Sequence, residues 1–417
     1  MGLNFARLLK TEIMSTERVK KTPVLILVLG LLTALGPIAT DIYLPAFDDI
    51  AEKLNTHIST ISFTLSSFFI GLSVGQLMYG PMLERFGRKK PIYVGLAIYF
   101  LSSLGCALAG DIYILIGLRF FQAIGACAGM VAARALVRDL FEDKEVAQVF
   151  SLLMVVVAVS PILAPTLGGL ITIQFGWRWV FASLSLLTLL ALVGVYFKLP
   201  QGKEANAMHS LKLKPVLRNY REVLLNKQFA VYAISGSIAY AGIYSYLSGS
   251  PHIYMELYEV SKTGYSIIFA IIAAGLIGSS QINTLILKRY RTEQVVFTAQ
   301  ICQCILALSL IVLFLMGIRG MYVTTVLIFL YMSCLGFIFP NASALSLLNL
   351  GHTAGNASAM LGSIQMVMGA IGSALVSYFQ VRTDMAMILV MSAAAFFAFT
   401  LLNFGRKKLQ IAYTLGK

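Results

Sequence analysis

Charged side chains are scarce in this sequence. Of its 417 residues, 12% are Asp, Glu, Lys or Arg, whereas 58% are hydrophobic, and the mean hydropathy is +0.82. A soluble domain could not cover its surface with so few charges. A membrane-spanning helix needs about 20 apolar residues, and such runs recur along the chain between short polar breaks. The sequence therefore predicts a polytopic helical membrane protein.

Residues that build metal, disulfide or nucleotide sites are also sparse. The five cysteines all lie in apolar runs and form no CxxC pair, and the four histidines are scattered at loops or span ends. An odd number of cysteines in apolar segments argues against a disulfide framework, and we expect no metal site. No GxxxxGK[ST] loop occurs, so we do not expect the chain to hydrolyse ATP itself. No cofactor is predicted.

The apolar runs predict twelve transmembrane helices and an all-α fold. The one long polar break, residues 199–227, mixes basic residues with Leu and Val around Pro200 and Pro215. That pattern predicts a linker carrying a basic amphipathic helix that lies on the membrane. The twelve spans are expected near residues 22–46, 58–80, 91–109, 112–136, 148–173, 178–198, 229–253, 263–287, 295–318, 321–348, 356–381 and 385–405.

The placement of basic residues predicts the topology. With the N-terminus in the cytoplasm, the inner segments hold 26 Lys and Arg residues and the outer loops hold 5. This positive-inside bias indicates that both termini and the linker are cytoplasmic, and the basic excess faces anionic lipid rather than nucleic acid. No small-residue cleavage site follows the first span, so we expect no removable signal peptide. The predicted N-tail, first six-helix half, linker, second six-helix half and C-tail are residues 1–21, 22–198, 199–227, 228–405 and 406–417.

Asp41 is the one acidic residue inside a predicted span. A charge at membrane depth costs roughly 2.5–3.5 kcal/mol on insertion scales, so an ionisable residue there is a functional-site hypothesis. The alternative is that Asp41 is hydrated at the headgroup boundary. Three apolar or aromatic residues, Tyr43, Pro45 and Phe47, still follow it, which favours the functional interpretation.

The most specific motif follows the second span, where the chain reads GPMLERFGRKK. It resembles the cytoplasmic loop signature of the major facilitator superfamily, with Glu84 in place of the usual Asp. The resemblance assigns a role in latching the outward-facing state to Gly80, Glu84, Arg85, Gly87 and Arg88. Physically, we expect Gly80 to let helices approach, Gly87 to permit a tight turn, and the acid to form ion pairs. The alternative is a plain topogenic charge cluster.

Two further spans carry motifs. Arg119 and Gln122, three residues apart on one helix face, resemble the superfamily's fourth-span Arg-x-x-Gln-Gly motif, with Ala123 replacing the glycine. The fifth span resembles the Gly-Pro-x-x-Gly-Gly region of superfamily drug/proton antiporters, although Ser160 stands where glycine is usual. A structural role for its prolines and glycines competes with a gating role. The fifth-span candidates are Ser160, Pro161, Pro165, Gly168 and Gly169.

Together, the segments 41–45, 67–71, 119–122, 134–140 and 176–179 resemble the bicyclomycin/chloramphenicol-resistance (Bcr/CflA) family of multidrug exporters. The resemblance implies a major facilitator fold with two six-helix halves. It also implies export of small amphipathic drug-like substrates in exchange for protons across the bacterial cytoplasmic membrane, powered by the proton gradient. We expect a monomer in the lipid bilayer. The second half matches this family in span pattern only.

Other functions stay open at this point. The same fold could serve a proton-coupled permease or exporter of a small metabolite, because fold does not fix substrate. A membrane enzyme would need paired acids, histidine clusters or an activated nucleophile, and only Asp41 and Arg119 are predicted to be buried and charged. A non-transporting sensor should carry a sizeable soluble domain, and no such stretch is present.

Polar residues at membrane depth are the candidates for a substrate cavity, although each could merely bridge helices by hydrogen bonds. Asp41 and Arg119 should both lie roughly 10 Å below the outer boundary at about 1.5 Å per residue. The resemblance implies that the first and fourth spans both border the central cavity, so we predict that Asp41 carries the coupled proton and that Arg119 tunes it; the rival account is a static ion pair. The predicted cavity residues are Tyr43, Gln122, Tyr240, Tyr244, Asn341 and Gln365.

The topology can be tested by labelling. Single cysteines introduced at Lys53 and at Asn206, in a variant without native cysteines, should react differently with a membrane-impermeant reagent, because only Lys53 is expected outside. In intact cells Lys53→Cys should label and Asn206→Cys should label only after permeabilisation. Labelling of Asn206→Cys from outside would reverse the predicted orientation.

Overall fold

The computed structural model describes residues 23–141, 143–200, 202, 205, 213–318, 320–348, 350, 354–380, 383 and 385–415. Across these ranges the secondary structure is helical, without a strand. The elements are α2 (Pro23–Asp41), η1 (Leu44–Ala46), α3 (Phe47–Lys53), α4 (Ile58–Phe86), α5 (Lys89–Leu108), α6 (Ile112–Leu140), α7 (Asp143–Phe175), α8 (Trp177–Lys198), α9 (Leu213–Leu225), α10 (Lys227–Pro251), η2 (His252–Leu257), α11 (Lys262–Ile286), α12 (Thr292–Leu315), α13 (Met321–Leu347), α14 (Ala354–Gln380) and α15 (Ala386–Leu415).

The helices have the lengths that a bilayer requires. Among the described residues, eleven segments are long and apolar enough to cross a membrane, judged by length and composition. A twelfth helix, α10, has 25 residues and carries several Ser, Gly and Tyr residues. It coincides with the seventh predicted span. The expected all-α membrane fold is confirmed.

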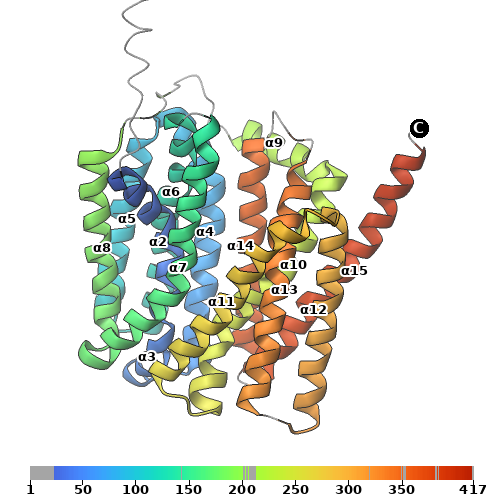
Figure 1. The fold of residues 1–417 in the computed structure, drawn as a ribbon. Helices are drawn as coiled ribbons and strands as arrows, with labels where there is room; N and C mark the ends of the chain where they lie inside the picture. Colours follow the sequence, from blue (N-terminus) through green and yellow to red (C-terminus); the bar gives the residue numbers. More distant parts are fainter. Residues whose placement is uncertain are drawn as a thin grey trace, which may run out of the picture.

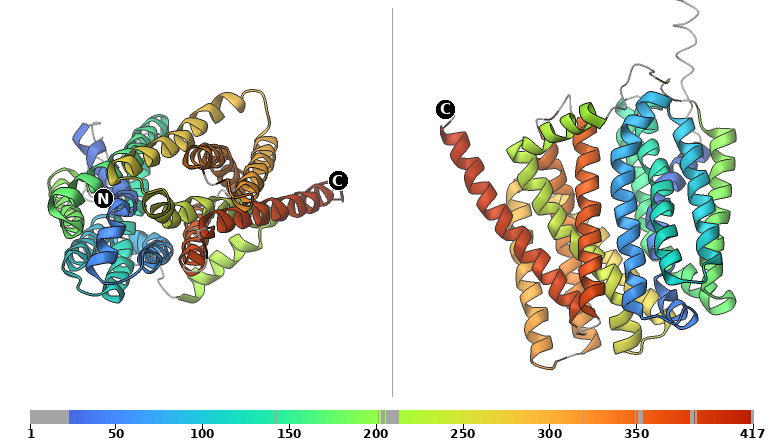
Figure 2. Two further views of the ribbon diagram at one scale, coloured as in Figure 1. Left: turned by 90° about the horizontal axis from the view of Figure 1, so that it is seen from below. Right: turned by 180° about the vertical axis from the view of Figure 1, so that it is seen from behind.

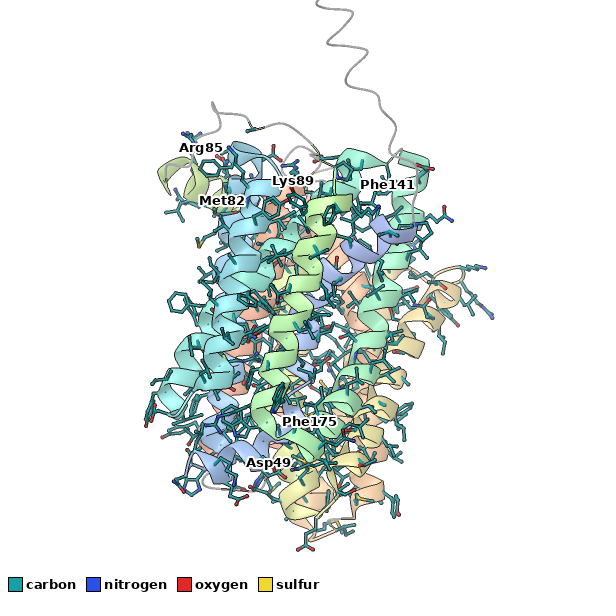
Figure 3. All side chains as sticks on the ribbon, turned by 90° about the vertical axis from the view of Figure 1, so that its left-hand side faces the viewer. Asp49, Met82, Arg85, Lys89, Phe141 and Phe175 are labelled. Carbon is teal, nitrogen blue, oxygen red and sulfur yellow. The ribbon has the colours of Figure 1, made fainter. Side chains whose placement is uncertain are left out.

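The helices form two bundles that stand side by side. Figure 1 shows α2 to α8 in one bundle and α10 to α15 in the other, and Figure 2 shows the same grouping from behind. We call the end of the molecule that carries α9 the α9 face and the opposite end, with α3, the α3 face. Figure 3 places Arg85 and Lys89 at the α9 face, and Asp49 and Phe175 at the α3 face.

Helix α9 lies within the predicted linker, most of whose earlier residues, 206–212 among them, are outside the described residues. Tyr220 and Val223 are buried in a cluster with Phe229 and Leu361, whereas Leu217 and Leu224 are exposed. The Tyr220 hydroxyl donates a hydrogen bond of 3.2 Å to the Leu77 carbonyl in α4. The amphipathic helix therefore forms as predicted. We expected it to lie on the membrane, but one of its faces packs against the rest of the protein.

The most extensive contacts between the bundles are made by two helix pairs. Helix α4 runs beside α14, and the pair is linked by hydrogen bonds between Ser66 and Ser373 (2.9 Å) and between Ser73 and Ser363 (2.7 Å). Helix α7 meets α11 near the α3 face, where the Ser266 hydroxyl donates to the Pro165 carbonyl at 3.1 Å.

An ion pair reinforces the contact at the α3 face. Lys262, the first residue of α11, pairs with Asp49 of α3 and lies 3.9 Å from Asp48. The Ser62 hydroxyl of α4 also donates to the Ser248 carbonyl of α10 at 2.9 Å. The α3 face is thus closed by polar contacts between the bundles.

The loop motif lies between α4 and α5 at the α9 face. Gly87 has φ 76° and ψ −177°, a backbone conformation that is almost restricted to glycine. Arg88 is 4% exposed and donates to Asp139 of α6 at 2.6 Å, to Glu84 at 3.1 Å and to the Leu83 carbonyl at 2.9 Å. Burial lowers the pKa of Arg88, but the hydrogen bonds and negative charges of Asp139 and Glu84 raise it by more, so the pKa is raised overall. The guanidinium therefore keeps its charge.

One expectation about this loop is wrong in this structure. We expected Gly80 to let helices approach, but a Cβ atom added there would have no heavy atom of another described helix within 4 Å, so no described helix packs closely against it. The ion pairs are centred on Arg88, and they join the end of α4 to the end of α6.

We predict that Gly87→Val reduces transport while membrane insertion persists. A β-branched residue in this conformation costs about 1–3 kcal/mol, and the strain falls on the Arg88 contacts rather than on the apolar spans. The measurement is export rate normalised to the amount of folded protein. Gly110→Val is the control, because Gly110 also lies in a loop, without a positive φ and with open space around its Cβ. Equal transport by both variants would contradict the prediction.

Candidate functional site

A cavity of about 450 Å³ lies between the two bundles, a size typical of small-molecule sites. Helices α2, α4, α6, α7, α10, α11, α13 and α14 all contribute to its wall. Along α11 its lining residues run from Phe269 to Gln281. Because α11 begins at the sealed α3 face, the cavity extends from that side of the molecule toward the α9 face. Its aromatic and methionine residues are Phe69, Met130, Tyr240, Tyr244, Tyr246, Phe269, Met332, Phe339 and Met366.

Asp41 is the only formally charged residue among the described residues that line this cavity. It is the last residue of α2 and is 4% exposed. The Thr40 hydroxyl lies 3.0 Å from one carboxylate oxygen and 2.8 Å from the Pro37 carbonyl. No described Lys, Arg or His forms an ion pair with Asp41. The cavity therefore presents one carboxylate, without a cationic partner among the described residues, on a largely apolar wall.

The position of Asp41 depends on close packing between α2 and α7. A Cβ atom added to Gly168 would lie 1.6 Å from the Ile42 carbonyl oxygen, so only glycine fits against the residue that follows Asp41. Pro161, two turns earlier in α7, lines the cavity. Ser160 is buried, and its hydroxyl has no hydrogen-bond partner in the described part of the chain.

The other fifth-span residues build the contact at the α3 face. The Pro165 carbonyl accepts the hydrogen bond from the Ser266 hydroxyl. A Cβ atom added to Gly169 would lie 3.3 Å from the oxygen of the same hydroxyl. The fifth-span motif thus packs against both α2 and α11. It fixes the turn after Asp41 on one side and the seal between the bundles on the other.

Arg119 lies apart from Asp41, inside the N-terminal bundle. Its side chain is fully buried and stacks between the rings of Tyr43 and Phe68, at 4.4 and 4.2 Å from their centroids. It donates a hydrogen bond of 2.5 Å to Gln122, while its Nε and Nη2 atoms have no described hydrogen-bond partner. Arg119 does not line the cavity and forms no ion pair with Asp41. A static ion pair between the two, the rival account above, is absent from this structure.

Four of the six predicted cavity residues do not line this cavity. Tyr43 contacts Thr64 at 2.8 Å, and Gln122 donates to Ser103 at 2.7 Å. Asn341 pairs with Asn283, the shorter of their two hydrogen bonds being 2.8 Å. Gln365 is buried outside the lining. The two that do line the cavity are Tyr240 and Tyr244, one turn apart on α10.

Several lining residues were not singled out by sequence reasoning. Phe69, Phe269 and the methionines belong to spans that are apolar on most sides, so periodicity does not show which residues face a cavity. Tyr240 stacks on Phe339 with ring centroids 4.3 Å apart, and Phe69 meets Tyr244 at 4.4 Å. These contacts join residues far apart in the sequence, which no local pattern reveals.

Comparison with known proteins identifies the fold family. Residues 29–373 match the family model of the Major Facilitator Superfamily. The chain belongs to this superfamily. It is 34% identical over 364 residues to the MFS-type transporter YdgK of Bacillus subtilis, covering 86% of this chain and 89% of that protein. Both the topology and the match show a multi-pass transporter of this superfamily.

The resemblance to the Bcr/CflA family is also confirmed. The chain is 29% identical over 374 residues to a bicyclomycin resistance protein homolog of Haemophilus influenzae, covering 90% of this chain and 94% of that one. It is 29% identical over 347 residues to multidrug resistance protein D of Escherichia coli, covering 82% and 86%. Among solved structures, a D-xylose–proton symporter superposes with a TM-score of 0.73 at 16% identity, covering 91% and 97%, which shows the shared fold alone.

The packing of α7 on α2 yields a prediction. Gly168→Ala should lower thermal stability and remove most transport, because the new methyl group overlaps the Ile42 carbonyl and overpacking of this kind costs about 1–3 kcal/mol. Gly117→Ala is the matched control, since Gly117 is also helical and has no heavy atom near its Cβ. The measurements are unfolding temperature and export rate. A Gly168→Ala protein as stable and active as Gly117→Ala would contradict the packing.

Proposed function

We propose that this transporter exports small amphipathic drug-like molecules in exchange for protons. The observation that carries the proposal is the single carboxylate of Asp41 on the wall of an apolar cavity between the bundles. A buried carboxylate without a cationic partner is costly as an anion. A proton or a cationic substrate removes that cost, so the two can compete for the same group, which is the basis of exchange.

The cavity wall supports an amphipathic substrate. Aromatic rings and methionine side chains supply a deformable apolar surface, and the only other polar groups are a few hydroxyls and the Gln281 amide. A sugar or similar metabolite needs many directed hydrogen-bond donors and acceptors. The described lining offers few of them, and this favours drug export over the metabolite permease. Resistance proteins among the relatives point the same way.

The proposed transport cycle uses alternating access. The Lys262–Asp49 pair and the Ser266–Pro165 bond close the α3 face, and the cavity extends toward the α9 face. With the positive-inside bias, the α9 face is cytoplasmic and the α3 face external, in a bacterial cytoplasmic membrane. This arrangement then corresponds to a state that is closed to the outside. Substrate enters from the inside, and the polar seal breaks before release.

We propose an indirect role for Arg119. Its guanidinium stacks on the ring of Tyr43, two residues after Asp41. Its Nε and Nη2 atoms, which have no hydrogen-bond partner among the described residues, lie in the same bundle. Movement of the α2 end during the cycle changes the distance between this fixed positive charge and Asp41. The guanidinium thereby biases the carboxylate from a distance, without forming an ion pair with it.

Asp41→Asn tests the proposal. The amide has the same shape but cannot release a proton, so the variant should lose uphill, protonophore-sensitive export while it still folds and exchanges substrate passively. Uphill uptake of a fluorescent cationic dye and of a neutral amphiphile into inverted vesicles, whose cytoplasmic face points outward, is the measurement. Asp111→Asn is the control, because Asp111 is exposed and caps α6, a role that Asn fills equally well. Full uphill export by folded Asp41→Asn protein would refute coupling through Asp41.

A further inference from the structure

Charged side chains from both bundles meet at the sealed α3 face. The N-terminal bundle contributes Asp48 and Asp49 of α3, and the C-terminal bundle contributes Lys262 of α11 together with His252 and Glu256 of η2. Lys262 pairs with Asp49 and lies 3.9 Å from Asp48. The Nδ1 atom of His252 contacts the Glu256 carboxylate. We call these five residues the outer cluster.

Glu256 opposes the closure of this face. Its carboxylate is close enough to that of Asp48 for the two negative charges to interact, and like charges on opposite sides of an interface repel. The side chains of Glu256 and Asp48 are 45% and 41% exposed, so salt weakens this repulsion. Lys262 attracts both aspartates of α3, but it carries a single charge.

Other charged groups beside the outer cluster leave this excess of negative charge in place. Glu52 and Lys53 of α3 cancel each other, and Glu259 follows η2. The described ends of α13, α14 and α15 at this face carry no Asp, Glu, Lys, Arg or His. The nearby tyrosines are neutral at physiological pH and are hydrogen-bonded through their hydroxyls: Tyr254, Tyr258 and Tyr265.

The protonation state of His252 decides the charge of the C-terminal side. With a neutral imidazole, the described residues there are one Lys against two Glu, a charge of −1 that faces a charge of −2 on α3. Protonation of His252 brings the C-terminal side to 0. The repulsion between the two bundles at this face is therefore smaller when His252 is charged.

We infer that His252 is a pH switch that favours closure of the α3 face when the solution at that face is acidic. Histidine is the side chain that titrates in the physiological range, near pH 6.5 when it is unperturbed. The Glu256 carboxylate beside His252 favours the charged imidazole. The His252 side chain is 18% exposed, so protons from the solution at this face can reach it.

This switch complements the coupling carboxylate. In the proposed cycle, the outer face must close once Asp41 has received a proton from outside. External acid that loads Asp41 also protonates His252, so the same acidity favours the return to the arrangement seen here. The inference takes from the proposed function only the external location of the α3 face. It depends neither on the substrate nor on the identity of the coupling residue.

The experiment measures opening of the α3 face directly, on purified full-length protein without substrate or a proton gradient. Spin labels at Tyr113→Cys and Tyr322→Cys, in a variant without native cysteines, report the distance across this face. These two tyrosines are 75% and 80% exposed, at the starts of α6 and α13. An Asp41→Asn background removes the contribution of Asp41 to the pH response.

We expect the ratio of closed to open protein to fall as pH rises from about 5.5 to about 8.5, on either side of the ordinary histidine pKa. The expected change is roughly two- to fivefold, the range that a partly exposed charge pair supports. A ratio that does not change with pH, or that rises with pH, overturns the inference. Drug export could still fail or succeed independently, because this measurement involves no substrate.

Variants assign the response to His252. His252→Gln should abolish the pH response and hold the ratio near its high-pH value, whereas His252→Lys should hold it near its low-pH value. His57→Gln is the matched control, because His57 is an exposed histidine before α4 whose side chain makes no capping hydrogen bond. A pH response that survives His252→Gln, or one that His57→Gln abolishes, overturns the inference.

Two further measurements leave His252 in place, in case its variants do not fold. Glu256→Gln removes the repulsion from Asp48, so it should raise the closed fraction at high pH. A high salt concentration should reduce the pH response of the unsubstituted cluster, because salt screens charges at a surface. An unchanged closed fraction in Glu256→Gln, or a pH response that is insensitive to salt, contradicts an electrostatic switch.

Discussion

The burial of one carboxylate in an apolar cavity is the constraint on which the rest of the structure depends. Asp41 ends α2 and lies where both bundles meet, so its environment is set by α7, α10 and α11 as well as by its own helix. Gly168 lets α7 pack against Ile42, the residue that follows Asp41. A protein that retains such a group must supply a proton or a cation to it, or move it toward water.

The two faces of the molecule are built differently. At the α3 face, Lys262 and Asp49 form a pair across the bundles, which solvent and salt can weaken when the face opens. At the α9 face, Arg88 ties α4 to α6 within one bundle, and Arg134 and Arg138 are left facing α14. The α3 face is thus closed by contacts within the chain itself.

The features that could be predicted from sequence are those that composition and local pattern determine. Span length, the basic linker helix and the turn at Gly87 follow from hydropathy, charge and glycine spacing. The family resemblance drew attention to Gly168, whose contact with Ile42 accounts for that glycine.

Side-chain partners could not be predicted, because they depend on how helices face one another. Asn341 was expected in the cavity, yet Asn283 from another helix engages it. Arg119 was expected beside Asp41 because of equal depth, but two helices at equal depth can point different ways, and Tyr43 and Phe68 hold its guanidinium. The residues that line the cavity come from spans without a polar face to mark them.

Proton movement driven by substrate is the most direct test of the central claim. Proteoliposomes are loaded with an exported amphiphile and a pH-sensitive dye, diluted into substrate-free buffer without a pH gradient, and compared with Asp41→Asn proteoliposomes. The account predicts that substrate efflux acidifies the interior in wild-type proteoliposomes only. An unchanged internal pH during wild-type efflux, or an alkaline shift, would contradict exchange for protons.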